Sequence, residues 1–308
     1  MKKVFIDGRA GTTGLRIEER LTGRDDVTLL TLPEELRKDP TARKEMINAA
    51  DYVFLCLPDA AAIEAVSMVE NPEVCVIDAS TAHRTNPDWA YGFPELGAAF
   101  EEKIIKSNRI AVPGCHASGF IALVYPLIES GILSKDALLT AHSLTGYSGG
   151  GKSMIADYEN GERSVLLDAP RQYALGQKHK HLPEMAKITG LKNPPVFSPI
   201  VSDFYSGMEV TVPLFKEFLN FGGLEDIKEI YRQRYHAPLV SYIEDDENGF
   251  LSAGKLSGKD RMEIQVCGND DRIILVARYD NLGKGASGAA IECFNVKLGC
   301  EKTKTLVL

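Results

Sequence analysis

The first fourteen residues constrain the fold of this chain more than any other segment. A short apolar strand, Lys3 to Ile6, is followed by a glycine-rich turn and a helical pattern. In a dinucleotide-binding turn of this kind, glycines allow a tight bend and the approach of a pyrophosphate, and N–H groups at the helix start face the phosphates. The residues expected to do so are Gly8, Gly11, Thr12, Thr13 and Gly14. The spacing is GxxGxxG instead of GxGxxG, so a glycine-rich turn without a ligand is the alternative.

Alternating strand and helix patterns continue to residue 78. Strands are expected at 27–32, 51–57 and 74–78, and helices at 41–49 and 60–69. Repeated β-α units predict an α/β fold with a doubly wound, Rossmann-type parallel sheet, whose ligand lies at the carboxyl ends of the strands. Two of these ends carry Pro58 and Ser80, which we therefore expect to face the cofactor.

The end of the second strand bears on the choice between NAD and NADP. An NAD site usually has an acidic residue there, which bonds the ribose 2′-hydroxyl. This strand ends in Leu32-Pro33, and Glu34 follows. The cations available for a 2′-phosphate are Arg9, Arg37 and Lys38. We therefore expect NADP(H), with NAD as the alternative if Glu34 reaches the ribose.

Cys115 is the candidate nucleophile. It follows Pro113-Gly114, where an apolar helix is expected to begin. Unpaired N–H groups and the positive end of the dipole at a helix N-terminus favour the thiolate, which is the reactive form. Most free cysteines are instead small buried apolar residues. The nucleotide-binding turn upstream and the histidine pair downstream favour an enzyme that forms a thioester on Cys115.

After Cys115 the pattern changes to clustered strands. They are expected at 138–145, 207–214, 262–266 and 273–277, with helices at 224–234 and 285–298. Apolar residues alternate along 207–214, as in a strand with one buried face. The second half therefore predicts an α+β domain whose sheet is covered on one face. A length of 308 residues also fits two domains better than one core.

One loop matches a competing pattern. Gly146 to Ser153 satisfies GxxxxGK[ST], the P-loop of nucleoside triphosphatases, and follows a strand. The polar His142 in that strand, and the lack of an apolar strand ending in Asp to hold magnesium, argue against a P-loop. We favour a glycine-rich loop whose N–H groups, with Ser148 and Lys152, bind an anionic substrate. A P-loop hydrolase remains an alternative.

The segment from His179 to Glu184 carries the candidate acid–base groups. His179 and His181 are two residues apart and point the same way on an extended segment, while Pro183 suits the first turn of a helix. Such a pair can supply an acid or a base to Cys115, with Glu184 to orient it. A solvated basic segment is the other interpretation. No third ligand has a supporting spacing, so no metal site is expected.

Charge and cysteine usage exclude several classes of partner. The net charge of −8 argues against nucleic acid or an anionic membrane as the main partner. The six cysteines are scattered without a CxxC pair, which fits reduced thiols in the cytoplasm better than disulfides or zinc. The sequence has no signal-peptide core and no apolar run of membrane-spanning length. We expect a cytoplasmic protein with a small-molecule substrate.

Several segments together resemble the N-acetyl-γ-glutamyl-phosphate reductases, most closely their short second type. Besides the glycine turn they are Asp78-x-Ser80-x-x-x-Arg84, YGFPEL, VPGCHASG, TGYSGGGK, HKHLPE and YDNLGKGASGAA. The resemblance covers nearly the whole chain in order. It extends to the wider group of aspartate-semialdehyde and glyceraldehyde-3-phosphate dehydrogenases.

The resemblance implies a role for each matching residue. Cys115 is the nucleophile, and His181, ahead of His179, is the acid–base group with Glu184 behind it. Arg84 resembles the phosphate-binding arginine of the wider group. Further residues expected to line the substrate are Ser148, Gly149 and Lys152, and those expected near the nicotinamide are Asn281, Gly283 and Gly285. Lys152 stands where the longer family type has arginine. A lysine makes a point-charge contact instead of a bidentate one, so how this residue would bind phosphate or carboxylate stays open.

The resemblance also implies an architecture and a reaction. The expected segments are a dinucleotide-binding domain (1–114), a catalytic and oligomerisation domain of the glyceraldehyde-3-phosphate dehydrogenase-like type (115–282), and a C-terminal helix that packs back on the first domain (283–308). NADPH would reduce N-acetylglutamyl 5-phosphate to the 5-semialdehyde in arginine biosynthesis, in a homodimer or homotetramer. A sibling enzyme that acts on aspartyl or aminoadipyl phosphate is the nearest alternative.

Overall fold

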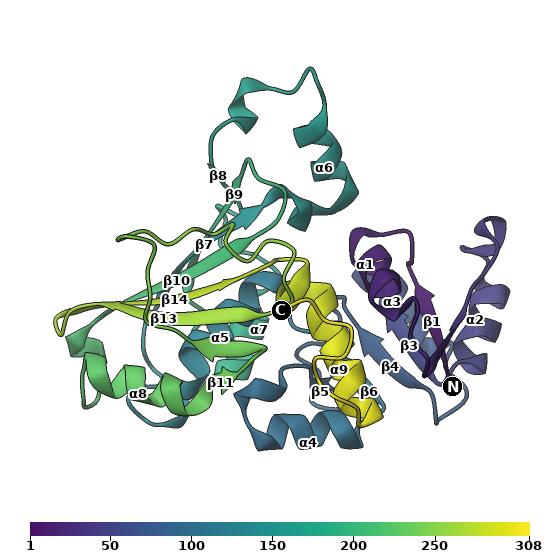
Figure 1. Cartoon of the computed structure of the whole chain (residues 1–308), viewed down its shortest axis with the longest axis horizontal. Helices are drawn as coiled ribbons and strands as arrows, with labels where there is room; N and C mark the ends of the chain where they lie inside the picture. Colours follow the sequence, from purple (N-terminus) through teal and green to yellow (C-terminus); the bar gives the residue numbers. More distant parts are fainter. The chain divides into compact units, whose positions relative to one another are not determined.

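A six-stranded sheet in the order β2-β1-β3-β4-β6-β5 forms the centre of unit 1, the first of two units in the computed structural model, which describes residues 1–308 (Figure 1). All its strand pairs are parallel. Unit 1 comprises Met1–Pro94, Ala98–Gly114 and Ala286–Leu306. Its strands are β1 (Lys2–Asp7), β2 (Val27–Leu30), β3 (Tyr52–Leu55), β4 (Cys75–Asp78), β5 (Ala90–Tyr91) and β6 (Arg109–Ala111). Its helices are α1 (Thr12–Leu21), α2 (Pro40–Ala49), α3 (Asp59–Ser67), α4 (Ala98–Lys106) and α9 (Gly288–Leu298).

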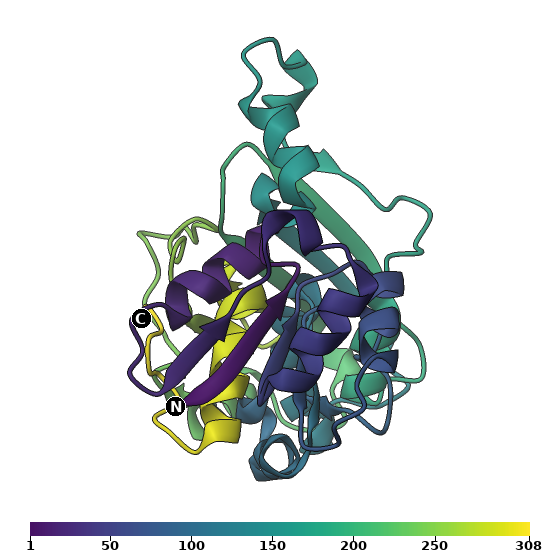
Figure 2. The ribbon, with the colours of Figure 1, turned by 90° about the vertical axis from the view of Figure 1, so that its right-hand side faces the viewer.

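Helices cover both faces of this sheet because successive strand residues point to opposite sides. On one face Ile6 of β1 shares a core with Ile17 of α1 and Phe294 of α9. On the other face Phe5 shares a core with Ile47 of α2. Figure 2 shows the yellow α9 behind the purple strands of this unit. The prediction of a doubly wound α/β domain is therefore confirmed.

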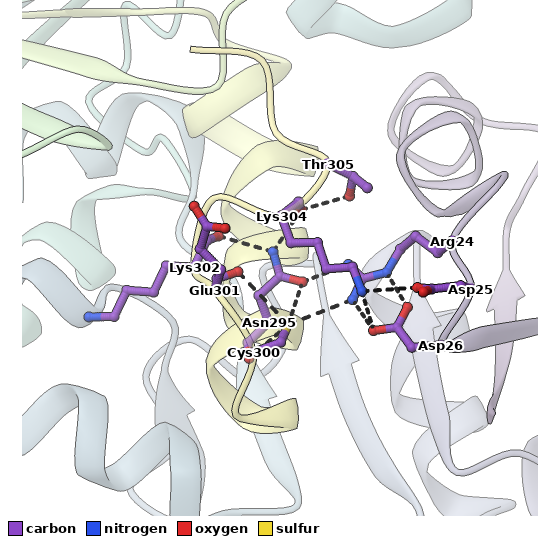
Figure 3. Close-up of polar contacts among 9 residues, drawn as sticks. All are labelled: Arg24, Asp25, Asp26, Asn295, Cys300, Glu301, Lys302, Lys304 and Thr305. Carbon is purple, nitrogen blue, oxygen red and sulfur yellow. Dashed lines mark hydrogen bonds and ion pairs between the residues drawn. The ribbon is translucent and has the colours of Figure 1, made fainter.

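A buried arginine ties the end of the chain to unit 1 (Figure 3). Arg24 donates to the side chain of Asn295 in α9 (2.6 Å) and to Asp26 (2.8 Å). Lys304 pairs with Asp26 from the other side (3.0 Å), and the Asn295 amide donates to the Lys302 carbonyl (3.0 Å). The hydrogen bonds from Arg24, with those from Lys304, hold the pKa of Asp26 far below its ordinary value.

Arg24→Met is expected to lower the free energy of unfolding by about 2–4 kcal/mol at pH 7, because it leaves the buried Asn295 and the partly buried Asp26 without their main donor. Since folding depresses the pKa of Asp26, the contribution of that carboxylate is present above its unfolded pKa and is lost as the pH falls through the folded value. Urea unfolding at pH 7 and pH 3 measures both effects. The control is Arg37→Ala, which removes only an exposed pair with Glu34. An equal loss in the two variants would contradict the assignment.

Unit 2 contains an eight-stranded mixed sheet in the order β11-β12-β13-β14-β10-β7-β9-β8. The unit comprises Glu95–Gly97, Cys115–Gly285 and Val307–Leu308. Its strands are β7 (Thr140–Gly146), β8 (Arg171–Gln172), β9 (Val196–Ser202), β10 (Met208–Phe215), β11 (His236–Ala237), β12 (Val240–Tyr242), β13 (Met262–Gly268) and β14 (Arg272–Tyr279). Its helices are α5 (Cys115–Glu129), α6 (Gly151–Glu159), α7 (Leu182–Thr189) and α8 (Leu224–Arg234).

One face of this sheet is covered by helices. Alternate residues of β10, Met208 to Leu214, are buried, and α5 contacts both β10 and β14. The residues between them face the other side, where Phe215 of β10 and Ile274 of β14 are exposed. This confirms the expected α+β domain with one covered face.

The unit boundaries differ from the prediction in detail. Residues 283–285 were expected with the C-terminal helix but cluster with unit 2, where they belong to a π-helical turn, Gly283–Ser287. Glu95–Gly97 and the last two residues also cluster with unit 2. No helix in residues 1–308 is both long enough and apolar enough to cross a membrane.

Candidate active site

Cys115 is the first residue of α5, and its side chain is only partly buried. The Tyr279 hydroxyl donates to the Cys115 carbonyl (2.5 Å) and accepts from the Gly119 N–H (3.0 Å). This hydroxyl, from the last residue of β14, therefore fixes the first turn of α5. A cysteine held at a helix N-terminus is the arrangement that favours a thiolate.

Gly285 lies directly against Cys115, the candidate nucleophile. A Cβ atom at Gly285 would be 3.1 Å from the Cβ of Cys115 and 3.1 Å from the Asp280 carbonyl oxygen. At Gly283 a Cβ would clash with the Lys259 carbonyl. Both glycines were expected near the nicotinamide. Their contacts within unit 2 favour a residue without a side chain at each position, and their place near the nicotinamide stays a prediction.

Asn281 anchors the glycine-rich loop. Its buried amide donates to the Ser148 hydroxyl (3.0 Å) and accepts from the Gly207 N–H (2.9 Å). Gly149 lies beside the same amide, since its Cβ would be 3.3 Å from the Asn281 nitrogen. Asn281 and Ser148 thus form a buried pair, and the exposed Gly149 lies beside them. Lys152 is exposed in the first turn of α6.

Two N–H groups of this loop donate hydrogen bonds to main-chain carbonyls of the same unit. The Tyr147 N–H donates to the Phe204 carbonyl (2.9 Å), and the Ser148 N–H donates to the Tyr205 carbonyl (3.0 Å). The prediction that the N–H groups of this loop bind an anion is therefore wrong for these two residues. A P-loop would direct them at phosphate, so the geometry also argues against the nucleoside triphosphatase alternative.

The two predicted histidines lie at the start of α7. Their ring centroids are 4.7 Å apart, and the His181 main-chain N–H donates to Nδ1 of His179 (3.2 Å). Burial, together with the charge of Lys180, lowers the pKa of His179 to about 4. His179 is therefore neutral at pH 7, with its proton on Nε2 because Nδ1 accepts a hydrogen bond.

Glu184 is buried in the first turn of α7, and its role of orienting a histidine stays a prediction. Burial, the charge of Cys115 and that of Glu184 all contribute to raising the pKa of Tyr279 far above its ordinary value. Cys115 and Glu184 thus lie within electrostatic reach of the same phenol. The histidines, the carboxylate and the thiol all belong to unit 2.

The glycine turn of unit 1 has the shape of a dinucleotide cradle. Gly8 has a φ of +87°, and a Cβ there would clash with the Cys56 carbonyl. A Cβ on Gly14 would lie 2.5 Å from the Gly8 carbonyl oxygen. Gly11 caps α1 without a side-chain bond, and the first turn, which holds Thr12 and Thr13, has no acidic residue. The N-terminus of α1 therefore suits a bound pyrophosphate.

The loops after β3 and β4 are tied to each other. Pro58 is the residue before α3, and Asp59 accepts from both the N–H and the hydroxyl of Thr81. The Ser80 hydroxyl donates to Asp78 (2.7 Å) and accepts from the Ala82 N–H (3.2 Å). These bonds give Ser80 a role in shaping the loop expected to face the cofactor.

Arg84 is buried and supports the segment that leads to the candidate nucleophile, Cys115. Its Nε donates to the Val112 carbonyl (2.8 Å) and its Nη2 to the Ala79 carbonyl (2.9 Å). Val112 precedes Cys115 by three residues in the sequence. The guanidinium therefore fixes main chain, in addition to any part in binding phosphate.

The cations proposed for a 2′-phosphate are at the surface of unit 1. Arg9 pairs with Glu18 (2.6 Å), and Arg37 pairs with Glu34 (2.9 Å). Lys38 is exposed next to Arg37. Glu34, the acidic residue considered for the ribose 2′-hydroxyl of NAD, is therefore paired with Arg37.

Family models match both units. The model described as the NAD binding domain of semialdehyde dehydrogenase matches residues 3–104, and the one described as the dimerisation domain of semialdehyde dehydrogenase matches residues 115–281. The N-acetyl-gamma-glutamyl-phosphate reductase of Rhizobium meliloti is 45% identical over 305 residues, covering 96% of this chain and 98% of the relative. The chain belongs to the N-acetyl-γ-glutamyl-phosphate reductase family. Unit 1 is its NAD(P)-binding domain.

Other relatives agree with this membership. The Burkholderia lata reductase is 43% identical over 304 residues, and each chain is 96% covered. A Nostoc protein named N-acetyl-gamma-glutamyl-phosphate reductase 2 is 43% identical, with 96% of this chain and 97% of the relative covered. Aspartate semialdehyde dehydrogenase II of Vibrio cholerae shares the fold, with a TM-score of 0.74 at 15% identity over 97% of this chain and 98% of that one.

Sequence reasoning missed three residues around Cys115: His116, Tyr173 and Tyr279. His116 is buried beside both predicted histidines, with ring centroids 5.5 Å from His179 and 5.6 Å from His181. Its position next to Cys115 in the sequence was the available signal. Tyr279 begins the YDNLGKGASGAA segment, but neither that segment nor the sequence around Tyr173 indicates that the phenol lies within electrostatic reach of Cys115.

Thiol labelling is expected to separate the cysteines by environment. All six are free, and burial raises the pKa of Cys75 to about 11. Burial also raises the pKa of Cys267, which is partly exposed like Cys115. Iodoacetamide at pH 7 should therefore modify Cys115 before Cys267, in step with inactivation, and should reach Cys75 only after denaturation. Peptide mapping by mass spectrometry measures the order, and earlier modification of Cys267 would contradict it.

Proposed function

We propose that the chain catalyses the NADPH-dependent reduction of N-acetyl-γ-glutamyl phosphate to N-acetylglutamate 5-semialdehyde, a step of arginine biosynthesis. The observation that carries the proposal is 43–45% identity to reductases of that name over 96% of the chain. The cysteine at the start of α5 and the two histidines of unit 2 support the same chemistry.

The Cys115 thiolate attacks the γ-carbonyl carbon of the substrate. The carbon–sulfur bond forms, the bond from carbon to the phosphate oxygen breaks, and inorganic phosphate leaves with the electron pair. N–H groups at the start of α5 are suited to stabilise the oxyanion that develops during the attack. Arg84 is the proposed phosphate-binding group, because it matches the arginine that the family resemblance implies there.

His181 is the proposed acid–base residue. His179 is a poorer candidate because its Nδ1 lone pair accepts the His181 main-chain N–H, and its low pKa leaves only an N–H to offer. Its role is to hold His181 in place. After reduction of the thioester, His181 assists the proton movement as the carbon–sulfur bond breaks, and Cys115 is released as thiolate.

The glycine cradle at α1 supports a bound dinucleotide. NADPH supplies the hydride that reduces the thioester carbon. Preference for NADP over NAD is supported by the pairing of Glu34 with Arg37 and by the neighbouring Lys38. Gly8, Gly11, Thr12, Thr13 and Gly14 would hold the pyrophosphate, with the loops at Pro58 and Ser80 beside the cofactor.

A homo-oligomer is also proposed. The match of residues 115–281 to a dimerisation domain supports a homodimer or homotetramer, and the uncovered sheet face with exposed Phe215 and Ile274 offers apolar surface for it. A cytoplasmic location is supported by the free thiols, since reducing compartments keep thiols unpaired.

The decisive assay runs the reaction backwards and avoids an unstable acyl phosphate. N-acetylglutamate semialdehyde with NADP and inorganic phosphate should give NADPH, and omission of phosphate should stop its formation. Aspartate semialdehyde is the competing substrate. A preference for it would replace the proposal with the sibling dehydrogenase, and magnesium-dependent ATP hydrolysis lost in Lys152→Ala would replace it with a P-loop enzyme.

A further inference from the structure

Next to the nucleophile, His116 is a buried imidazole whose two nitrogens are both engaged. Nδ1 lies 2.7 Å from the Ser143 hydroxyl of β7, and Nε2 lies 2.7 Å from the Tyr173 hydroxyl that follows β8. The side chain is almost fully buried and packs edge-on against Phe197 of β9 (5.3 Å between ring centroids). None of the steps proposed above uses His116, Ser143 or Tyr173.

Only one of the two nitrogens of His116 carries a proton. Burial, with a further contribution from His179, lowers the pKa of His116 to about 3, so the ring is neutral at pH 7. A neutral imidazole has one N–H donor and one lone pair. The Ser143 and Tyr173 hydroxyls must therefore act in opposite senses, one donating to the ring and the other accepting from it.

The negative charge at Cys115 decides which of the two hydroxyls donates to His116 and which accepts from it. Burial and the negative charge of Cys115 both raise the pKa of Tyr173, so the phenol keeps its proton near a thiolate. If Tyr173 donated to His116, only oxygen lone pairs would remain for the anion, which is repulsive. If Nε2–H of His116 donates to Tyr173, the phenol O–H stays available for the anion, and the Ser143 hydroxyl donates to Nδ1.

We infer that His116 is a positioning residue, which aims the Tyr173 hydroxyl as a hydrogen-bond donor at the negative charge of the reacting centre through the chain Ser143 to His116 to Tyr173. The inference rests on the proposed function. That charge starts on the Cys115 sulfur and moves to the carbonyl oxygen when the carbon–sulfur bond forms. A donor fixed beforehand lowers the barrier without reorganising at the moment of reaction.

The variants His116→Gln and His116→Asn carry the same amide group and differ only in the length of the side chain. The amide nitrogen of His116→Gln can approach the position of Nε2 and donate to Tyr173, whereas that of His116→Asn is one methylene shorter. We expect His116→Asn to lower kcat by about 10–100-fold with little change in KM, as for loss of an oxyanion donor. His116→Gln should recover most of that kcat, although both variants lose the ring.

The test repeats the pair in the Tyr173→Phe background. If His116 acts through the Tyr173 hydroxyl, Asn and Gln at residue 116 give the same kcat once the hydroxyl is gone. A merely structural role predicts that their difference persists, and persistence would overturn the inference, as would wild-type kcat in His116→Asn. If neither amide variant folds, as judged by circular dichroism, Ser143→Ala replaces them, with a several-fold fall in kcat expected in the wild type and none in Tyr173→Phe.

The results distinguish failure of the positioning role from failure of the proposed function. Wild-type protein that forms no NADPH from N-acetylglutamate semialdehyde, NADP and phosphate contradicts the function itself. Wild-type protein that is active, with kcat independent of the reach of residue 116, contradicts only the positioning role.

Discussion

Cys115→Ala is expected to remove phosphate-dependent reduction of NADP by N-acetylglutamate semialdehyde, with a fall in kcat on the order of 10⁴-fold or more. The reason is that alanine cannot hold the acyl group as a thioester, and no other thiol lies at the start of α5. Tyr279 donates to the main-chain carbonyl of residue 115, a bond that alanine retains, so the variant should keep the local structure. Steady-state formation of NADPH measures the effect.

The matched control is Cys267→Ala. Cys267 is also a free, partly buried thiol, but it lies on β13 with a pKa raised by burial. Its replacement should leave kcat within about 2-fold of the wild type, as is usual for residues away from the reaction. Equal losses in the two variants would show that activity depends on general stability, and activity retained in Cys115→Ala would exclude the thioester.

His181→Asn is expected to lower kcat by about 10²–10⁴-fold, the range for loss of a general acid–base group. Thiol labelling of Cys115 should still occur in this variant, because the nucleophile and its helix are unchanged. The pH profile of kcat should lose the limb that His181 supplies. Stopped-flow measurement of NADPH formation from pH 5 to pH 9 tests both expectations.

His179→Asn is the comparison that distinguishes the two histidines. Asparagine can still accept the His181 main-chain N–H, which is the one hydrogen bond His179 makes to that residue here. We expect about a 10-fold loss or less, with the pH profile retained. A larger loss in His179→Asn than in His181→Asn would reverse the assignment.

The cofactor domain was predictable because its signals are local. Gly8 adopts a positive φ of +87°, and a side chain at Gly14 would meet the main chain of Gly8 and Arg9, so the spacing of the glycines carries the requirement. The alternation along β10 likewise follows directly from a sheet with one covered face. These features do not depend on how distant parts of the chain meet.

Parts of the second unit were not predictable for the opposite reason. β9 contains Pro199, which usually argues against a strand, yet it pairs with β7 and β8. The sequence suggested that the N–H groups of Tyr147 and Ser148 could bind an anion, but in the structure they donate to the carbonyls of residues 204 and 205. The role inferred for His116 depends on Ser143 of β7 and on Tyr173, which follows β8, and the sequence around His116 indicates neither contact.

The covalent intermediate can be observed directly. Enzyme mixed with N-acetyl-γ-glutamyl phosphate in the absence of NADPH and quenched in acid should carry one N-acetylglutamyl group, mapped by mass spectrometry to Cys115 and absent from Cys115→Ala. An unmodified Cys115 in enzyme that turns over normally once NADPH is added, or an acyl group on another residue, would contradict catalysis through this thiol.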